Sequence, residues 1–294
     1  MDDEAWHAIA RRNSRSVQTT IGWIFWDPGA IRRYETLGLP SQFAGPLGYM
    51  AARSAPLAGA GPDAVIAAFG SISPAAIRGV FSILGGPERF LQFWEARDEA
   101  VVAGLRDHAS AIIEPLQQIG PELWDVVGQL PLVGRTFFAS HLAMPRHEDP
   151  LLYGWHAVNC LREWRGDTHW ALVVAHGLEH AEASILHNAW LGYEPDWLPR
   201  SRGTSDDDLA RGWDSLHRRG LAVDGTVTDE GIHLRQHIEN ETDRLTTLPW
   251  RLLGRERSLW FAEAFEPPCE LLLSRVDTTA GPNYQPASRI RPPR

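Results

Sequence analysis

The sequence predicts a mainly α-helical protein in which an N-terminal multi-helix domain is followed by a winged-helix-like module with a small β-hairpin. Apolar residues recur at three-to-four spacing through much of the 294-residue chain, as they do on amphipathic helices. One segment, around Asp224-Gly225, has the turn residues of a tight hairpin. The stretch from Gly192 to Ser205 holds two prolines and two glycines and is the best domain boundary. We therefore expect a helical domain over 1–195, the module over 205–275 and a disordered tail over 276–294.

Helices are predicted where the apolar spacing continues between glycine and proline breaks. In the first half of the chain these segments are 2–24, 30–37, 62–69, 73–84, 87–111, 122–129 and 135–142. Ser73-Pro74 is typical of a helix start, with serine as the cap and proline in the first turn. The longest periodic stretch runs from Leu151 to about Leu191, and we expect two helices there, split near Arg165-Gly166-Asp167.

The module is predicted from the order of its elements. Ser205 followed by three aspartates indicates a helix start, and this helix runs to about Arg219. Two short β-prone runs, 221–223 and 226–228, flank Asp224-Gly225 and predict a hairpin. A second helix is expected over 229–247. Helix, hairpin and helix in this order are compatible with a winged-helix module.

Composition indicates a protein of the cytoplasm. With 44% hydrophobic residues and 13 tryptophans, the chain can bury a large core without disulfides. Its two cysteines, Cys160 and Cys269, lie far apart in sequence and form no ligand pair, which fits a reducing compartment. The acidic start lacks the pattern of a signal peptide, and no apolar run reaches the roughly 18 residues of a membrane span. We expect no membrane partner.

The charge balance disfavours nucleic acid as a partner. All 28 basic residues are arginines, and the net charge is −9. Phosphate neutralisation needs a basic face. Residues 201–294 hold 13 arginines against 15 acids and are close to neutral. DNA binding by the module is therefore disfavoured by charge but stays among the alternatives.

Three stretches carry a resemblance to a known family: Trp155-His156-Ala157 through Glu182-Ala183, Arg219-Gly220-Leu221 through Asp243, and Arg33-Tyr34-Glu35 through Leu57. Over about residues 21–254 the chain resembles an actinobacterial family of helix-turn-helix-containing proteins. The resemblance implies a winged helix accompanied by further helices, and it implies no particular activity. His141, His147, His176 and His180 depart from the family's pattern.

Four histidines mark the best candidate site. On one continuous helix His169, His176, His180 and His187 would share a narrow stripe, because each residue turns about 100°. His176 and His180 would lie roughly 6 Å apart along the axis, the usual spacing for two histidines that bind one metal from one helix. The other two lie about 10 Å further along and are too distant to join them.

The pair lies in His176-Gly177-Leu178-Glu179-His180, an H-x-x-E-H string that also marks inverted zinc metalloproteases. On this hypothesis the two histidines hold a divalent metal (Zn or Fe) or a haem, and Glu179 acts as general base. The third-ligand candidates, among which the sequence does not choose, are His156, Asp167, Glu182, His141 and His147. The alternative is packing or substrate contact, since a five-residue match has low specificity.

A second polar cluster is Arg165-Gly166-Asp167-Thr168-His169. Asp167 is expected either to orient His169 or to hold a helix start, and Arg165 either to bind an anionic substrate or to form a salt bridge with Asp167 or Glu163. Arg53 is a further candidate substrate ligand, for which an ion pair is the favoured alternative.

The leading functional hypothesis is a small-molecule enzyme with a pocket in the helical domain, metal- or haem-assisted through His176 and His180. His169, Asp167 and Glu179 would then be catalytic, and Arg53, Arg165 and His156 would bind the substrate. The main alternative is a ligand-responsive DNA-binding regulator that uses residues 205–247. A third hypothesis is a protein that sequesters a ligand without chemistry. A homodimer is the candidate assembly.

Overall fold

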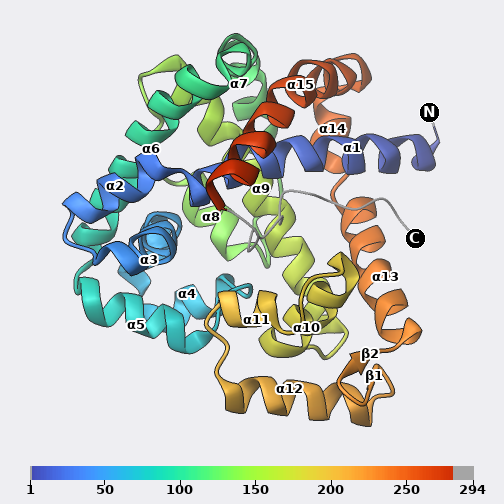
Figure 1. Cartoon of the computed structure of the whole chain (residues 1–294). Helices are drawn as coiled ribbons and strands as arrows, with labels where there is room; N and C mark the ends of the chain where they lie inside the picture. The colour runs from blue at the N-terminus through green and yellow to red at the C-terminus, as the bar shows by residue number, and fades with distance from the viewer. Residues whose placement is uncertain (1, 281–294) are drawn as a thin grey trace.

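A long helix, α9 (Pro150–Ala175), runs through the centre of the computed structural model, which describes residues 2–280 (Figure 1). Nearly all of its residues from Leu151 to Thr168 are buried, on every side of the helix. A helix that is buried all round is expected at the centre of a large core. The chain therefore builds its other helices around α9.

The helices before α9 form a shell around its first half. They are α1 (Asp3–Gly22), α2 (Pro28–Thr36), α3 (Ser41–Ser54), α4 (Pro62–Ala68), α5 (Pro74–Leu84), α6 (Pro87–His108), α7 (Ile113–Val127) and α8 (Thr136–Leu142). Short 3-10 turns, η1 (Trp23–Trp26), η2 (Ala55–Ala60) and η3 (Ser110–Ile112), connect some of them. The predicted start of α5 is confirmed, because the backbone N–H of Ala76 donates to the Ser73 hydroxyl over 3.1 Å.

The chain after α9 contains the predicted helix, hairpin and second helix, and then returns to pack against the N-terminal helices. Its elements are α10 (His180–Leu191), α11 (Trp197–Ser201), α12 (Asp206–Arg218), β1 (Ala222–Val223), β2 (Thr226–Val227), α13 (Asp229–Leu245), α14 (Leu248–Leu253) and α15 (Arg255–Ala280). The last helix, α15, packs against α1. The mainly helical fold with one small hairpin is thus confirmed.

The hairpin has the geometry that its turn residues predict. Ala222 pairs with Val227, and Val223 pairs with Thr226, in antiparallel register. Asp224 and Gly225 both have positive φ, 46° and 71°. A two-residue turn of the I′ type requires this at both positions, and the Asp-Gly sequence supplies it.

Two separate apolar clusters divide the molecule. The larger is built from α1 to α9 together with α14 and α15. The smaller joins the end of α9, α10, α12, the hairpin and α13, through Val173, Leu178, Ile185, Leu186, Leu209, Leu216, Leu221, Ala222 and Ile238. The smaller cluster draws on both sides of the linker at 192–205, so that linker does not coincide with the boundary between the cores.

The helices differ from the predicted ones at several places, and α3, α14 and α15 lie where no helix is predicted. α9 continues through Arg165-Gly166-Asp167, and the break falls instead after Ala175, where Gly177 has a φ of 65° and ends the helix. α7 begins at Ile113 and passes through Pro121, where a helix start at Glu122 was expected. Of the expected tail, residues 276–280 form the end of α15 and the remainder lies outside the described residues.

Among residues 2–280, no helix is both long enough and apolar enough to cross a membrane.

Candidate functional site

The buried charges of α9 each bind a different neighbouring helix. Glu163 accepts two hydrogen bonds from Arg53 of α3, of 3.0 and 2.7 Å, and one of 2.8 Å from Arg162. Burial alone would raise the pKa of Glu163, but the two arginines outweigh it and lower the pKa to about 2. The ion-pair alternative for Arg53 is therefore confirmed, and its guanidinium lies against the ring of Phe69 at 4.2 Å.

Arg165 fastens α13 onto α9. Its Nη2 donates to Glu239 over 2.6 Å and to Asp243 over 2.8 Å. The predicted salt bridge with Asp167 or Glu163 is wrong, because those carboxylates lie on other sides of α9. Glu239 and Asp243 are one turn apart on α13, which lets one guanidinium reach both.

Asp167 and His169 do not form a dyad. Asp167 accepts the backbone N–H of Phe138 over 2.8 Å, near the start of α8, so the helix-start alternative is confirmed. Burial raises the pKa of Asp167 to about 7. His169 points instead to α13, where its Nδ1 lies 3.0 Å from the hydroxyl of Thr242. That hydroxyl donates to the Ile238 carbonyl, so Nδ1 of His169 carries the proton and donates.

The histidine pair does not share a helix, and the predicted stripe is wrong in this respect. His176 is the C-cap of α9, whereas His180 is the first residue of α10, and Gly177 with its positive φ separates them. Glu179 is the N-cap of α10, and its backbone N–H donates to Glu182 over 2.7 Å. This capping box accounts for Glu179 at the start of α10 by a structural role, with no need of a catalytic one.

The surroundings of the two histidines also differ. The His176 ring lies edge-on to that of His237, 5.4 Å between centroids. Nε2 of His180 lies 2.7 Å from the Thr204 hydroxyl, and burial lowers the pKa of His180 to about 4. Within the described part of the chain, no group of three or more His, Cys, Asp or Glu side chains is placed to hold a metal ion. A metal or haem role for the pair stays a prediction.

His156 lies in the larger core. Its Nε2 lies 2.8 Å from Asp98, which also accepts from Arg97, and its ring stacks on Trp94 with 4.9 Å between centroids. Burial would raise the pKa of Asp98, and the charge of Arg97 and the contact with His156 lower it instead. Of the predicted site residues, then, Arg53, Arg165, Asp167 and His156 take part in contacts that join α9 to four different helices, and no single site unites them with Glu179.

A small pocket lies beside the smaller apolar cluster, between α9, α10 and α13. Its space, including the part open to solvent, is about 310 Å³. One wall is apolar and consists of Trp170, Val173, Leu178, Ala183, Leu186 and Ile238. The polar lining consists of His169, His187, Arg202 and Arg235.

The polar lining of this pocket is electropositive. Burial and the charge of Arg235 lower the pKa of Arg202 to about 10. Burial, with Arg235 as the next cause, lowers the pKa of His169 to about 3 and also holds that of His187 well below its usual value. Both histidines are therefore neutral at pH 7, and no carboxylate is among the residues of 2–280 that line the pocket.

Sequence reasoning found His169 but missed Arg202 and Arg235. Arg235 follows the apolar spacing of its helix as a buried member, 6% exposed, and Arg202 lies in the linker, 7% exposed. An arginine in a linker or on an amphipathic helix is ordinarily exposed. Burial at these two positions follows from tertiary packing and has no local signal.

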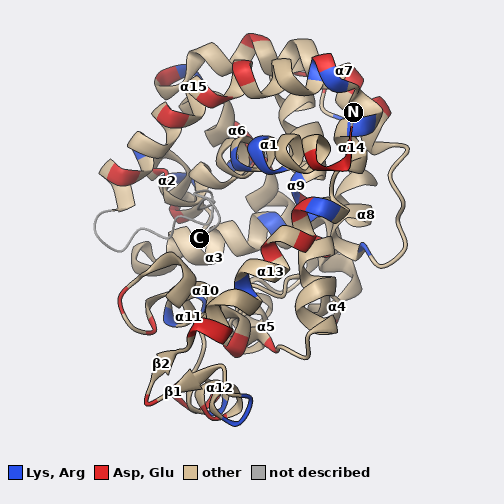
Figure 2. Ribbon diagram, turned by 90° about the vertical axis from the view of Figure 1, so that its right-hand side faces the viewer, with Lys and Arg blue, Asp and Glu red and all other residues tan. Residues whose placement is uncertain are grey.

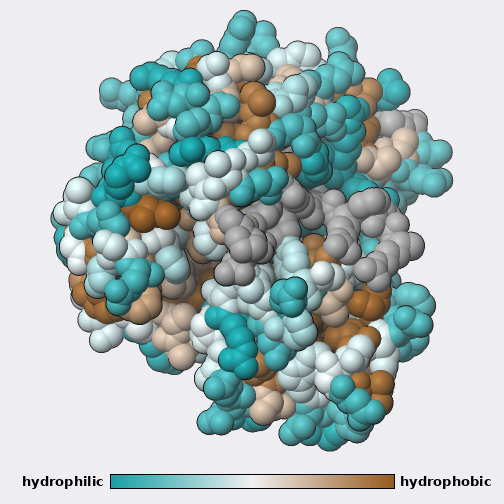
Figure 3. Space-filling model, viewed as in Figure 1, coloured by the Kyte–Doolittle hydropathy of each residue, from teal (hydrophilic) through white to brown (hydrophobic). Residues whose placement is uncertain are grey.

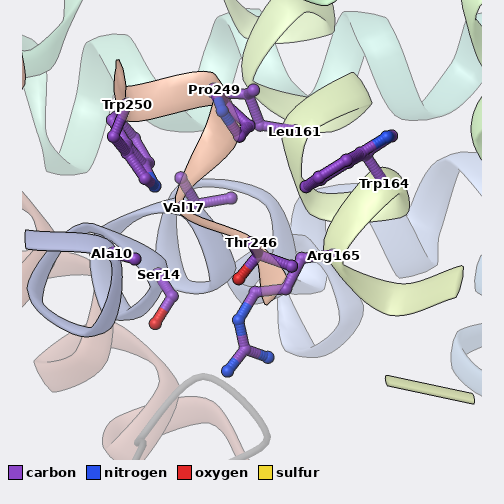
Figure 4. Close-up of a pocket in the computed structure, with 9 residues that line it drawn as sticks. All are labelled: Ala10, Ser14, Val17, Leu161, Trp164, Arg165, Thr246, Pro249 and Trp250. Atoms are coloured by element: carbon purple, nitrogen blue, oxygen red, sulfur yellow. The ribbon is translucent and has the colours of Figure 1, made fainter. Parts of the chain in front are cut away.

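A second pocket lies between α1, α9 and α14 (Figure 4). Its lining is mostly apolar and includes Leu161, Trp164 and Trp250. In Figure 4, the Arg165 guanidinium points away from Pro249 and Leu161. It donates to the two acids on α13 described above. The hydroxyl of Thr246 donates to the Thr242 carbonyl. This pocket presents few polar groups for binding a ligand.

The helix before the hairpin presents an open face at the edge of the molecule (Figure 1). Leu209, Gly212 and Leu216 face inward, and a Cβ at Gly212 would lie 3.1 Å from that of Ala181, so α12 packs closely on α10. The outward residues of α12 include Arg211, Asp214 and Arg218. Figure 2 shows both signs of charge on this helix, and Figure 3 shows mainly hydrophilic to neutral residues along this edge.

Comparison with known proteins gives one match. A family model described as a helix-turn-helix family matches residues 10–278, from the first turns of α1 to the end of α15. Neither a curated protein nor a solved structure matches the chain.

Proposed function

The chain belongs to the helix-turn-helix family, and on that premise we propose that it is a ligand-responsive DNA-binding transcriptional regulator. α12 is the helix that enters the major groove, and the β1–β2 hairpin is the wing beside it. The observation that carries the proposal is the position of α12. It follows α10 and α11, directly precedes the hairpin, packs on α10 with one face and leaves the other exposed.

The exposed face of α12 suits contacts with base edges. Arg211, Asp214 and Arg218 are spaced three and four residues apart and lie on one stripe of the helix. An arginine donates to the two major-groove acceptors of guanine, and a carboxylate accepts from the amino group of cytosine. Arg211 is paired with Asp208 on the surface, a contact that is exchanged easily in water.

The charge of this face limits contacts with phosphate. The first turn of α12 holds Asp206, Asp207 and Asp208, and the turn of the hairpin contains Asp224. These carboxylates repel the DNA backbone, so non-specific affinity is low. If about two arginines per protomer contact phosphates, the slope of the logarithm of the DNA-binding constant against the logarithm of the salt concentration is about −2 per protomer. Sequence preference then comes from base edges and not from charge.

The ligand-responsive part of the proposal is supported by the pocket between α9, α10 and α13. Four of its lining residues, Val173, Leu178, Leu186 and Ile238, belong to the smaller apolar cluster. A ligand there touches the residues that position α10 and α13. Since α12 packs on α10, a change in that packing reaches the DNA-binding face.

Selection from random DNA tests the proposal. The full chain is incubated with 30-bp duplexes of randomised sequence at low salt, and bound duplexes are amplified over several rounds. We expect one enriched motif, and a palindrome with half-sites one helical turn apart if two copies bind. A bound pool that stays random after all rounds would overturn the proposal.

A further inference from the structure

Arg235 carries an unused donor in the pocket wall. Its Nη2 donates to Glu239 over 2.7 Å, and its guanidinium lies 4.7 Å from the centre of the Trp190 ring. Its Nη1 is buried and has no hydrogen-bond partner among the described residues. The side chain as a whole is 6% exposed. Buried donors are almost always paired, so this one calls for an acceptor that residues 2–280 do not supply.

The carboxylates near Arg235 do not fully neutralise its positive charge. Glu239 is shared between Arg165 and Arg235, and Asp243 is shared between Arg165 and Arg11. Arg202 lies close enough for Arg235 to lower its pKa. The two carboxylates Glu239 and Asp243 are thus shared among three arginines, and an anion beside Arg235 completes the balance of this group.

The apolar wall of the pocket indicates which kind of anion fits. Trp170, Leu178 and Leu186 are apolar and give no hydrogen bond to a second polar end, apart from the indole N–H. A ligand with one charged end and one flat apolar body matches the chemistry of these two sides, and the side chains around the enclosed space move apart to admit it. Inorganic phosphate matches the arginines but leaves the apolar wall uncovered.

We propose that the pocket between α9, α10 and α13 binds a small aromatic or apolar carboxylate, whose carboxylate lies against Arg235 and Arg202 and whose body lies against Trp170 and Leu186. Binding itself does not depend on DNA. The role of the carboxylate as the effector rests on the proposed function.

Benzoate and benzamide form a matched pair of probes, because they differ in charge and little in shape. The full chain is titrated with each at pH 7, with heat of binding and thermal midpoint as the readouts. Benzoate is expected to bind saturably with one site per chain and to raise the midpoint, and benzamide is expected to do neither. Equal effects of the two probes would overturn the proposal, as would a rise with phosphate and none with benzoate.

Two variants locate the site. Arg235→Met keeps a long stem and removes the donors, and we expect at least about a tenfold weaker affinity for benzoate. Arg257→Met changes a surface arginine that pairs with Glu122, and its affinity should equal that of the wild type. Benzoate binding by folded Arg235→Met at wild-type affinity would contradict the proposal.

A third variant decides the case if Arg235→Met does not fold. Ala183 lines the same pocket from α10, so Ala183→Phe fills the space and leaves every charge in place. We expect it to fold and to lose benzoate binding, and unchanged binding would overturn the proposal. Because no DNA is present, these outcomes are independent of the DNA selection, and either proposal can fail alone.

Discussion

Asp167 is a carboxyl group that the fold keeps close to neutral at physiological pH. It is 8% exposed, and burial raises its pKa from the ordinary value of 3.8 to about 7. The contribution of such a group to stability is complete below the unfolded pKa and is lost as the pH rises through the folded pKa. At pH 8 the ionised carboxylate therefore weakens the fold.

The variant Asp167→Asn tests how much stability the protein loses when the Asp167 carboxyl ionises. The amide keeps an acceptor for Phe138 and carries no charge. We expect the advantage of the variant over the wild type in free energy of unfolding to be about 1–3 kcal/mol larger at pH 8 than at pH 5, measured by urea denaturation. Asp125→Asn, at an exposed position, is the control and should differ little at either pH. An equal effect of Asp167→Asn at both pH values would contradict the raised pKa.

Arg165 is the residue that ties the module to the central helix. Replacing it with methionine leaves Glu239 and Asp243 buried without their shared cation. We expect a loss of about 3–5 kcal/mol in the free energy of unfolding, because uncompensated buried charge is costly. Arg257→Met breaks a half-exposed pair and should cost about 0–1 kcal/mol. Similar losses for the two variants would show that Arg165 acts as a surface arginine does.

At the scale of elements, the closest packing in the first core is between α7 and α9. A Cβ on Gly154 would lie 2.0 Å from the backbone oxygen of Leu116, and the facing residue on α7 is Gly120. Glycine is required at 154 because backbone cannot give way as a flexible side chain can. The central helix therefore depends on this glycine for its position.

Two alanine variants of the same helix test that approach. Gly154→Ala is expected to destabilise the protein by about 3 kcal/mol or more, as overpacking against backbone does. Gly166→Ala meets only the Glu163 carboxylate, at 3.8 Å, and should be neutral or stabilising by up to about 1 kcal/mol. Thermal and urea denaturation measure both. A Gly154→Ala protein as stable as Gly166→Ala would refute the close contact.

The same elements show what the sequence can predict. α5 and α12 begin where Ser73 and Ser205 cap them, and the hairpin turns at Asp224-Gly225, because each of these signals acts through its own neighbours. Pro46 and Pro121, and Pro267-Pro268 in α15, lie inside helices, where packing overrides the lost hydrogen bonds. Continuous apolar spacing from 151 to 191 likewise hid the glycine that ends α9.

The candidate site was less predictable than the elements. Arg53, Arg165 and Arg235 bind partners on other helices, of which Glu163 is 110 residues from Arg53 in sequence. Which carboxylate an arginine meets depends on how helices cross, and spacing within one helix does not record this. The predicted histidine stripe was wrong for a local reason. It assumed one continuous helix, which the positive φ of Gly177 interrupts.

At the scale of the whole molecule, α9 belongs to both cores. Trp155 and Trp164 anchor it in the larger core, and Val173 belongs to the smaller. The charged contacts of Arg165 and the pocket beside His169 lie between these two ends. On the proposed function, a ligand in the pocket would contact the end of α9 and α13, and α12 lies at the outer edge of the molecule (Figure 1).

The most direct test of DNA binding through α12 is the affinity of the double variant Arg211→Ala/Arg218→Ala for the selected duplex, measured by fluorescence anisotropy across a salt series. The control, Arg32→Ala/Arg106→Ala, removes the same charge from exposed positions elsewhere. We predict binding at least about tenfold weaker for the α12 variant, because base contacts are lost, with a salt slope close to that of the wild type, and near wild-type binding for the control. Equal affinities of the two variants would contradict the account.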